Sequence, residues 1–153
     1  MRIGLDARMI TRNPTGIGRV ARELVRELLR LDGPEEYQLY SNRALPDGFV
    51  PPEGRHGTVV ARLPLPLWQA AALPLALWRD KAQVFHSHVF GLPWRPPGCR
   101  TVLTMHDLTF EIFPQHDWKD ALKYQVLARW SAERADHLIA DSENTRQDLM
   151  DLY

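Results

Sequence analysis

The chain has 153 residues, of which 44% are hydrophobic and 25% are charged, values that are ordinary for one soluble globular domain. Its 19 basic and 19 acidic side chains cancel, which argues against a nucleic-acid-binding protein. The single cysteine, Cys99, cannot form an internal disulfide, and we expect an unreactive thiol in a reducing compartment. The sequence shows no signal peptide and no uncharged run of the roughly 20 residues that a spanning helix needs. We therefore expect a cytoplasmic protein.

Apolar runs of strand length alternate with segments of helical periodicity along the chain. Strands are predicted over Arg2–Asp6, Tyr37–Ser41, Thr58–Leu63, Gln83–Ser87, Arg100–His106 and His137–Ala140. Helices are predicted over Ile17–Leu31, Leu67–Arg79 and Asp117–Ala135, and from the capping residue Ser142 onward. This alternation predicts a Rossmann-like three-layer α/β/α fold with a mainly parallel, doubly wound sheet, formed by residues 1–153 as a single domain.

Each predicted helix has an apolar face that we expect to pack on the sheet. In the first helix this face comprises Ile17, Val20, Ala21, Leu24, Leu28 and Leu31. In the second, which we predict despite Pro74, it comprises Trp68, Ala71, Ala72, Leu75 and Trp78. The third helix carries Leu122, Val126, Leu127 and Trp130.

Two surfaces raise the question of membrane contact. The first helix has an arginine stripe of Arg19, Arg22, Arg26 and Arg30, but Glu23 and Glu27 lie at spacings that pair with Arg19 and Arg30, as in a solvated helix. The uncharged run Leu63–Trp78 is the better candidate for an apolar binding site or a membrane contact, although burial on the sheet is the favoured expectation. Peripheral attachment to the inner face of the membrane is thus an alternative that the sequence does not favour.

A glycine-rich segment, Gly16-Ile17-Gly18-Arg19-Val20-Ala21, opens the first predicted helix. It matches the G-x-G-x-x-[GA] fingerprint of dinucleotide-binding proteins, but two features argue against a nicotinamide or flavin cofactor. Residues 7–15 separate the first strand from Gly16, and the second strand ends in Tyr40-Ser41-Asn42 without the acid that would bind a ribose hydroxyl. A glycine-lined helix N-terminus still suits a phosphate. The alternative is a plain strand-to-helix turn in which glycine eases packing.

Polar residues gather where two of the predicted strands end. His106 and Asp107 follow the apolar run Thr101–Met105, and His86 and His88 end the preceding strand. Ligands of open parallel sheets bind beyond the carboxyl ends of the strands, where an imidazole can bind a hydroxyl or phosphate or transfer a proton. The alternative is a histidine that satisfies a loop carbonyl. The histidines lack the H-E-x-x-H or paired CxxC spacing of zinc sites, so no metal site is predicted.

Three segments occur in an order that forms a recognisable pattern. They are Met1–Arg8 with Pro14–Arg19, then Val84–His88 with Thr104–Leu108, and finally Ala135–Thr145 with the form A-D-x-[IV]-[IV]-x-x-S-x-x-[TS]. Together they resemble the family 4 retaining glycosyltransferases of GT-B fold, and the resemblance covers nearly the whole chain. It implies two Rossmann-like domains that face a cleft and need no metal or other cofactor. The N-terminal domain holds the acceptor, and the C-terminal domain holds the nucleotide sugar.

The resemblance also implies roles for individual residues. His106 would be the catalytic residue, in contact with the transferred sugar or the phosphate edge, where it assists the departing group. Gly16 and Gly18 would lie near the donor diphosphate, and Arg19 would help to bind the anion. Asp107 and Ser142 would shape and line the cleft.

The paired-glutamate motif that binds the donor in this family belongs to the second domain, and no residue of this chain supplies it. The sequence therefore predicts an acceptor-side domain, inactive alone, of an enzyme that moves a hexose from a nucleotide-diphosphate sugar to a glycan or lipid-linked hydroxyl. Such an activity belongs to polysaccharide biosynthesis. The last helix reaches Tyr153 without a Gly or Pro stop, so we expect a fragment of a longer protein. The alternative is a stand-alone Rossmann-like binding or interaction module without catalysis.

Overall fold

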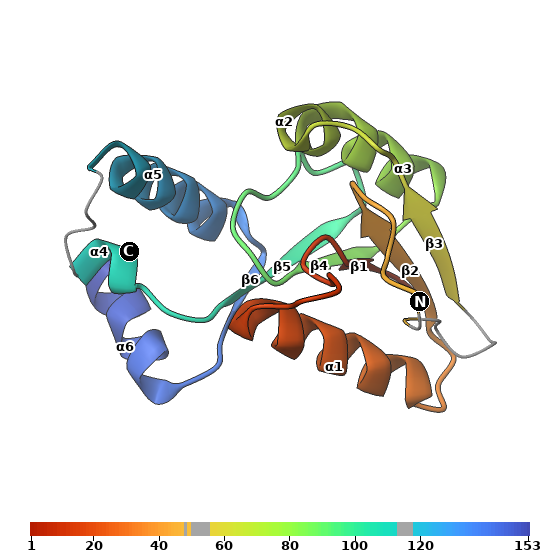
Figure 1. Cartoon of the computed structure of the whole chain (residues 1–153), viewed down its shortest axis with the longest axis horizontal. Helices are drawn as coiled ribbons and strands as arrows, with labels where there is room; N and C mark the ends of the chain where they lie inside the picture. Colours follow the sequence, from red (N-terminus) through yellow and green to blue (C-terminus); the bar gives the residue numbers. More distant parts are fainter. Residues whose placement is uncertain (48, 50–55, 113–117) are drawn as a thin grey trace.

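The computed structural model describes residues 1–47, 49, 56–112 and 118–153. Its centre is a six-stranded sheet of order β3-β2-β1-β4-β5-β6, in which every neighbouring pair is parallel (Figure 1). The strands are β1 (Arg2–Asp6), β2 (Glu36–Ser41), β3 (His56–Val60), β4 (Val84–Ser87), β5 (Arg100–Met105) and β6 (His137–Ala140). This is the doubly wound order, which reverses direction between β1 and β4.

Helices cover both faces of this sheet. They are α1 (Gly16–Arg30), α2 (Leu65–Leu67), the π-helical turn η1 (Trp68–Ala72), α3 (Leu73–Arg79), α4 (Thr109–Ile112), α5 (Trp118–Arg134) and α6 (Glu143–Leu152). Figure 1 shows α1 and α6 on one side of the sheet, and α2, α3 and α5 on the other. The predicted three-layer fold is therefore confirmed. No helix in the described ranges is long and apolar enough to cross a bilayer.

Three apolar clusters hold the layers together. One joins α1 to β1 and β2 through residues such as Val25, Leu5 and Leu39. A second joins α3 and η1 to the opposite face, and the third packs α5 and α6 against β5. Cys99 lies in the second cluster, where burial raises the pKa of its thiol to about 11, so the thiol is protonated at neutral pH as an inert structural cysteine should be.

The third strand is shorter than predicted at its C-terminal end. We expected Thr58–Leu63, but β3 spans His56–Val60, and the Leu63 amide donates to the Ala61 carbonyl in a turn. Pro64 follows at the N-cap of α2, so the chain leaves the sheet to begin the helix.

The helix after β3 continues through Pro74, but with a different buried face from the one predicted. A proline has no amide hydrogen to donate within a helix, and the π turn η1 ends at Ala72, two residues before Pro74. The π turn lengthens the interval between buried residues, so Leu73 is the next buried residue after Trp68. From Leu73 onward the buried residues have normal α-helical spacing, at Ala76 and Leu77. The predicted burial of Leu75 and Trp78 is wrong, since they are 63% and 61% exposed.

The faces of α1 and α5 also differ in part from the prediction. Helix α1 buries Gly18, Ala21 and Val25, while the predicted core residues Val20 and Leu31 are exposed. In α5 the buried positions are occupied by small residues such as Ala128 and Ser131, and Leu122 and Val126 face solvent. Small residues permit close packing of α5 on the sheet, which hydrophobicity alone does not predict.

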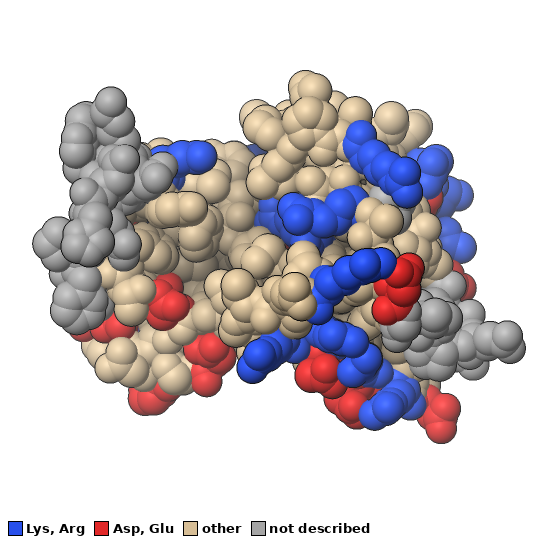
Figure 2. Space-filling model, viewed as in Figure 1, with Lys and Arg blue, Asp and Glu red and all other residues tan. Residues whose placement is uncertain are grey.

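The predicted solvation of the arginine stripe of α1 holds only in part, since Arg19 and Arg30 are exposed whereas Arg22 and Arg26 are half-buried. Glu27 pairs with Arg30 at 2.7 Å, and Glu23 pairs with Arg26 at 3.0 Å rather than with the expected Arg19. Figure 2 shows acidic and basic side chains interleaved over α1. Exposed pairs of this kind contribute little to stability, about 0.5 kcal/mol each.

Candidate functional site

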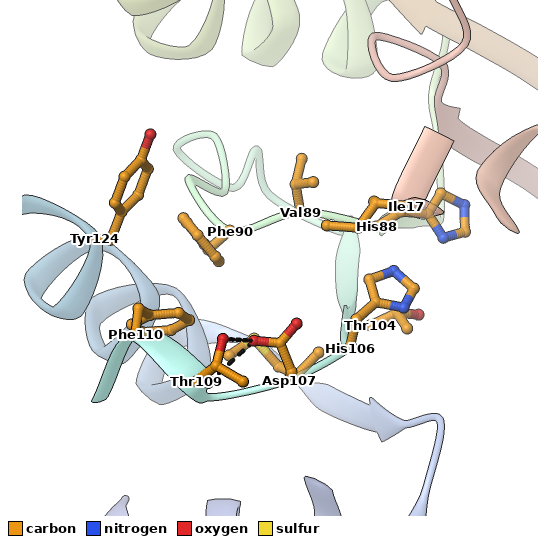
Figure 3. Close-up of a pocket in the computed structure, with 11 residues that line it drawn as sticks. Ile17, His88, Val89, Phe90, Thr104, His106, Asp107, Thr109, Phe110 and Tyr124 are labelled. Atoms are coloured by element: carbon orange, nitrogen blue, oxygen red, sulfur yellow. Dashed lines mark hydrogen bonds between the residues drawn. The ribbon is translucent and has the colours of Figure 1, made fainter. Parts of the chain in front are cut away.

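A cavity of about 280 Å³ lies beyond the carboxyl ends of β4 and β5 (Figure 3). Its wall includes Ile17 in the first turn of α1, His88 after β4, and His106 and Asp107 after β5. The cavity therefore lies beside the point where the strand order reverses, the usual ligand position in this fold. Predicted site residues His106 and Asp107 line it, whereas Gly16, Gly18, Arg19 and Ser142 are not among its lining residues.

His106 is held in a defined orientation at the end of β5. Its Nδ1 atom lies 2.9 Å from Oδ2 of Asp141, which follows β6, and its side chain is 11% exposed. A carboxylate only accepts hydrogen bonds, so Nδ1 carries the donated proton and Nε2 of the neutral ring becomes an acceptor. This Nε2 atom is buried and has no hydrogen-bond partner in the described part of the chain. No described residue therefore competes with a ligand group for this atom.

The backbone of His106 is fixed from the same side. Its carbonyl accepts a 2.9 Å hydrogen bond from the Thr145 hydroxyl in the first turn of α6. Ser142 caps that helix, as predicted, by accepting a 3.0 Å bond from the Thr145 amide. The Ser142 hydroxyl therefore supports the His106 loop through Thr145, apart from any role in lining a cleft.

His88 is a polar group in an apolar setting. Its side chain is 1% exposed, and neither ring nitrogen has a hydrogen-bond partner among the described residues. Burial, followed by the neighbouring His86 and His106, lowers the pKa of His88 to about 3, so the ring is neutral near pH 7. A neutral imidazole has one donor and one acceptor, which suits a hydroxyl group better than a phosphate.

His86 has a more structural environment. Its Nε2 atom lies 2.8 Å from the Thr104 hydroxyl on β5, and its ring centroid lies 4.4 Å from that of His88. Burial lowers the pKa of His86, the Asp6 carboxylate opposes this shift, and His106 adds a smaller lowering. No group of three or more His, Cys, Asp and Glu side chains is arranged to hold a metal ion in the described residues.

Asp107 serves as a local cap. Its Oδ1 atom accepts hydrogen bonds from the Thr109 amide at 3.0 Å and the Thr109 hydroxyl at 2.6 Å (Figure 3). These bonds fix the start of α4 and so the direction in which the chain leaves the His106 loop. The contribution of Asp107 to substrate binding stays a prediction.

The two glycines of the fingerprint have different surroundings. A Cβ atom on Gly18 would lie 2.6 Å from the Met9 carbonyl oxygen and 2.9 Å from Cβ of Pro14, so this glycine allows the loop to pack on α1. A Cβ on Gly16 would meet nothing within 4 Å. The first turn of α1 contains no acidic residue, and Thr15 makes no side-chain cap bond. Its first amides are therefore available to an anion.

A buried ion pair supports the other side of the site, and we did not predict it. Nε of Arg8 lies 2.8 Å from Oδ2 of Asp6, with side chains 6% and 2% exposed. The Ser87 hydroxyl donates to the same carboxylate at 2.8 Å, and the Arg8 guanidinium donates to the Val89 and Phe90 carbonyls at 3.3 Å. The pair thereby fixes the loop that carries His88. In the sequence, Asp6 at the end of the apolar strand β1 is the feature that could have indicated this ion pair.

An aromatic wall forms the opposite end of the cavity from the histidines. The Phe90 ring lies 5.5 Å from Phe110 and 5.8 Å from Tyr124, measured between centroids, and all three line the cavity (Figure 3). Gly91, at a φ of 87°, follows Phe90 and donates its amide to the Ser131 hydroxyl at 2.7 Å. A ligand here would meet polar nitrogens at one end and apolar rings at the other.

A doubly wound parallel sheet, with its cavity beside the point where the strand order reverses, defines a Rossmann-like α/β domain. The sequence model of Glycosyltransferase Family 4 matches residues 14–153. The chain belongs to this family, and its fold is that of a GT-B N-terminal domain. A search of curated proteins finds no match.

Proposed function

We propose that this domain is the acceptor-side part of a retaining transferase that moves a hexose from a nucleotide-diphosphate sugar to a glycan or lipid-linked hydroxyl. The observation that carries this proposal is His106, whose buried Nε2 atom lacks a partner among the described residues at the cavity while Nδ1 is tied to Asp141. A metal-independent reaction and a role in polysaccharide biosynthesis are part of the same proposal.

The reaction exchanges two bonds at the anomeric carbon of the sugar. The bond from this carbon to the diphosphate oxygen breaks, and a bond to the acceptor oxygen forms, while the acceptor hydroxyl proton leaves with the nucleoside diphosphate. As a neutral ring, His106 would accept a hydrogen bond from a hydroxyl of the hexose. When protonated, it would donate to the departing phosphate and stabilise its charge.

The start of α1 would face the diphosphate. The amides of its first turn, which Thr15 does not cap, and its helix dipole favour an anion, and Ile17 of this turn lines the same cavity as His106. Gly16 leaves open space at this turn, so a phosphate could approach the backbone closely. Arg19 lies on the exposed surface of the same turn and would add a positive charge.

The acceptor would occupy the aromatic end of the cavity. Phe90, Phe110 and Tyr124 offer ring faces on which a sugar or an apolar group can stack. The paired-glutamate donor motif of the family is absent from this sequence, so we expect no turnover by this chain alone.

A matched pair of variants tests the proposal. In the intact gene product, assayed with nucleotide-diphosphate hexoses, His106→Ala should lower the transfer rate about 100-fold or more, as expected for loss of a positioned acid–base or charge-stabilising group. His137→Ala, which alters an exposed histidine on β6, is the control and should leave the rate unchanged. Full turnover in His106→Ala, or a product of inverted anomeric configuration, would refute the proposal.

A further inference from the structure

The imidazole of His88 has no role in the proposed reaction, and its surroundings are unusual for a polar group. The side chain is 1% exposed, and both ring nitrogens are buried without a hydrogen-bond partner among the described residues. A neutral imidazole carries one donor and one acceptor. Buried donors and acceptors are almost always paired in native proteins, because an unpaired one destabilises the fold. The ring therefore indicates a ligand that supplies the missing bonds.

The polar side chains next to His88 are already bonded to other groups. Nε2 of His86 lies 2.8 Å from the Thr104 hydroxyl, and the Ser87 hydroxyl donates to Asp6 at 2.8 Å. The rings of His86 and His88 are in tilted contact, with 52° between their planes, and share no hydrogen bond. His88 also lines the cavity, so a bound molecule can supply the partner that these neighbours do not.

His88 lies at the same end of the cavity as His106. Figure 3 shows both rings near Ile17, at the end opposite Phe110 and Tyr124. Nε2 of His106 is likewise buried and has no partner in the part of the chain that the structure describes. Imidazoles that follow the neighbouring strands β4 and β5 thus leave ring nitrogens unpaired in one region of the cavity.

The chemistry of these two histidines favours hydroxyl groups as ligands. Burial, with smaller contributions from His86 and His106, lowers the pKa of His88 to about 3, so near pH 7 the ring offers no charge to a phosphate. The described residues hold no group of three His, Cys, Asp or Glu side chains arranged for a metal ion, as a zinc site would need. A sugar hydroxyl both donates and accepts, so it can bond to either nitrogen of a neutral ring.

We propose that His88 binds a hydroxyl group of the transferred hexose, next to the hydroxyl that His106 binds, and thereby selects the donor sugar. This inference rests on the proposed function, in which the diphosphate faces the start of α1, the acceptor lies on the aromatic rings, and the hexose lies beside the histidines. A site built to bind a hydroxyl rejects an analogue without it, because the buried polar group then stays unpaired. The acceptor-side domain would thus share in the choice of the donor.

Kinetics of the intact protein test this role of His88. Release of nucleoside diphosphate is measured with UDP-glucose, UDP-galactose and GDP-mannose, and the best donor is compared with analogues that each lack one hydroxyl of the hexose. His88→Phe should lower kcat/KM for the full donor about tenfold, because an apolar ring of similar size cannot bind a hydroxyl. For the analogue that lacks the bound hydroxyl, His88→Phe and the parent should have equal kcat/KM. His88→Gln, whose amide keeps a donor and an acceptor, should recover part of the loss.

The exposed His137 on β6 provides the control, since His137→Ala should treat every donor as the parent does. A His88→Phe protein with the parent's kcat/KM for the full donor would overturn the inference. So would an equal fall with the full donor and with every analogue, because the loss of one hydrogen bond cannot affect a donor without that hydroxyl. Circular dichroism should show His88→Phe folded, since phenylalanine fills the space of the imidazole.

The ring nitrogens of His88 allow a second measurement, by NMR on the chain itself. At least one of the three donors, at millimolar concentration, should shift the nitrogen resonances of this ring, whereas UDP or GDP alone should not, because only the hexose carries the hydroxyl. No shift with any donor, or the same shift with the nucleotide alone, would overturn the inference. An intact protein that releases no nucleoside diphosphate, while the hexose still shifts the His88 ring, would refute the proposed function alone.

Discussion

Gly16 and Gly18 lie in one turn of α1, yet the structure predicts opposite effects of replacing them by alanine. In Gly18→Ala the new Cβ would approach the Met9 carbonyl oxygen to 2.6 Å. A backbone oxygen cannot rotate away, so we take the upper part of the usual cost of overpacking, about 3 kcal/mol. The higher helix propensity of alanine offsets about 1 kcal/mol of this. The free energy of unfolding should thus fall by about 2 kcal/mol.

Gly16→Ala meets no such contact, because its Cβ has no neighbour within 4 Å. Reduced entropy of the unfolded chain should make this variant equal to the parent or about 0.5 kcal/mol more stable. Thermal unfolding followed by circular dichroism should separate the two variants by roughly 4–10 °C in Tm, at about 2–4 °C per kcal/mol for a domain of this size. Equal stabilities, or a less stable Gly16→Ala, would refute the account of the glycine loop. Weaker ligand binding by a fully stable Gly16→Ala would instead indicate a ligand at this turn.

Three further predictions concern polar groups around the cavity. Arg8→Met should lower the free energy of unfolding, measured by urea titration, by about 3–5 kcal/mol, because it leaves the buried Asp6 carboxylate without its cation. A loss below about 1 kcal/mol would contradict this explanation. Asp141→Asn should lower kcat/KM of the intact protein by about tenfold or more with little change in Tm, because Nδ1 of His106 loses its carboxylate partner. An unchanged pH–rate profile would count against this role of Asp141. His88 is neutral in the folded chain down to its pKa of about 3 but binds a proton below pH 6.5 when unfolded, so its contribution to stability falls as the pH drops through 6.5. Urea titrations of His88→Phe should therefore lose less stability than the parent between pH 6.5 and 5, by about 2 kcal/mol, and parallel pH profiles would exclude this explanation.

The periodicity of the sequence predicted the layers and most element boundaries, because alternation of strand and helix patterns reports directly on which residues can face a sheet. The periodicity failed to predict which residues are buried where the helix geometry depends on a single backbone group. Pro74 removes a helical donor, and the adjoining π turn moves Trp78 from the expected core position to the surface. Hydrophobicity alone also misplaced Val126, since α5 packs through Ala128.

The site was predictable where it depends on position along one strand. His106 and Asp107 follow the apolar run of β5, and parallel strands place such residues at one edge. Contacts between strands distant in sequence were not predictable. Asp6 of the Asp6–Arg8 pair accepts a hydrogen bond from Ser87 because β1 and β4 are neighbours. His106 contacts Asp141 because β5 and β6 are neighbours. Strand order, which single-sequence patterns do not encode, decides both contacts.

The most direct test of the account is a titration of this chain with nucleotide-diphosphate hexoses, followed by amide chemical shifts. The proposed function places the donor-binding residues outside this sequence. The account therefore predicts weak, millimolar binding of the nucleotide-diphosphate hexose. The amides that shift should be those of Ile17, of His88 to Phe90 and of His106 to Thr109, around the cavity. Micromolar binding, or shifts confined to a distant surface such as Arg95 to Arg100, would contradict the account.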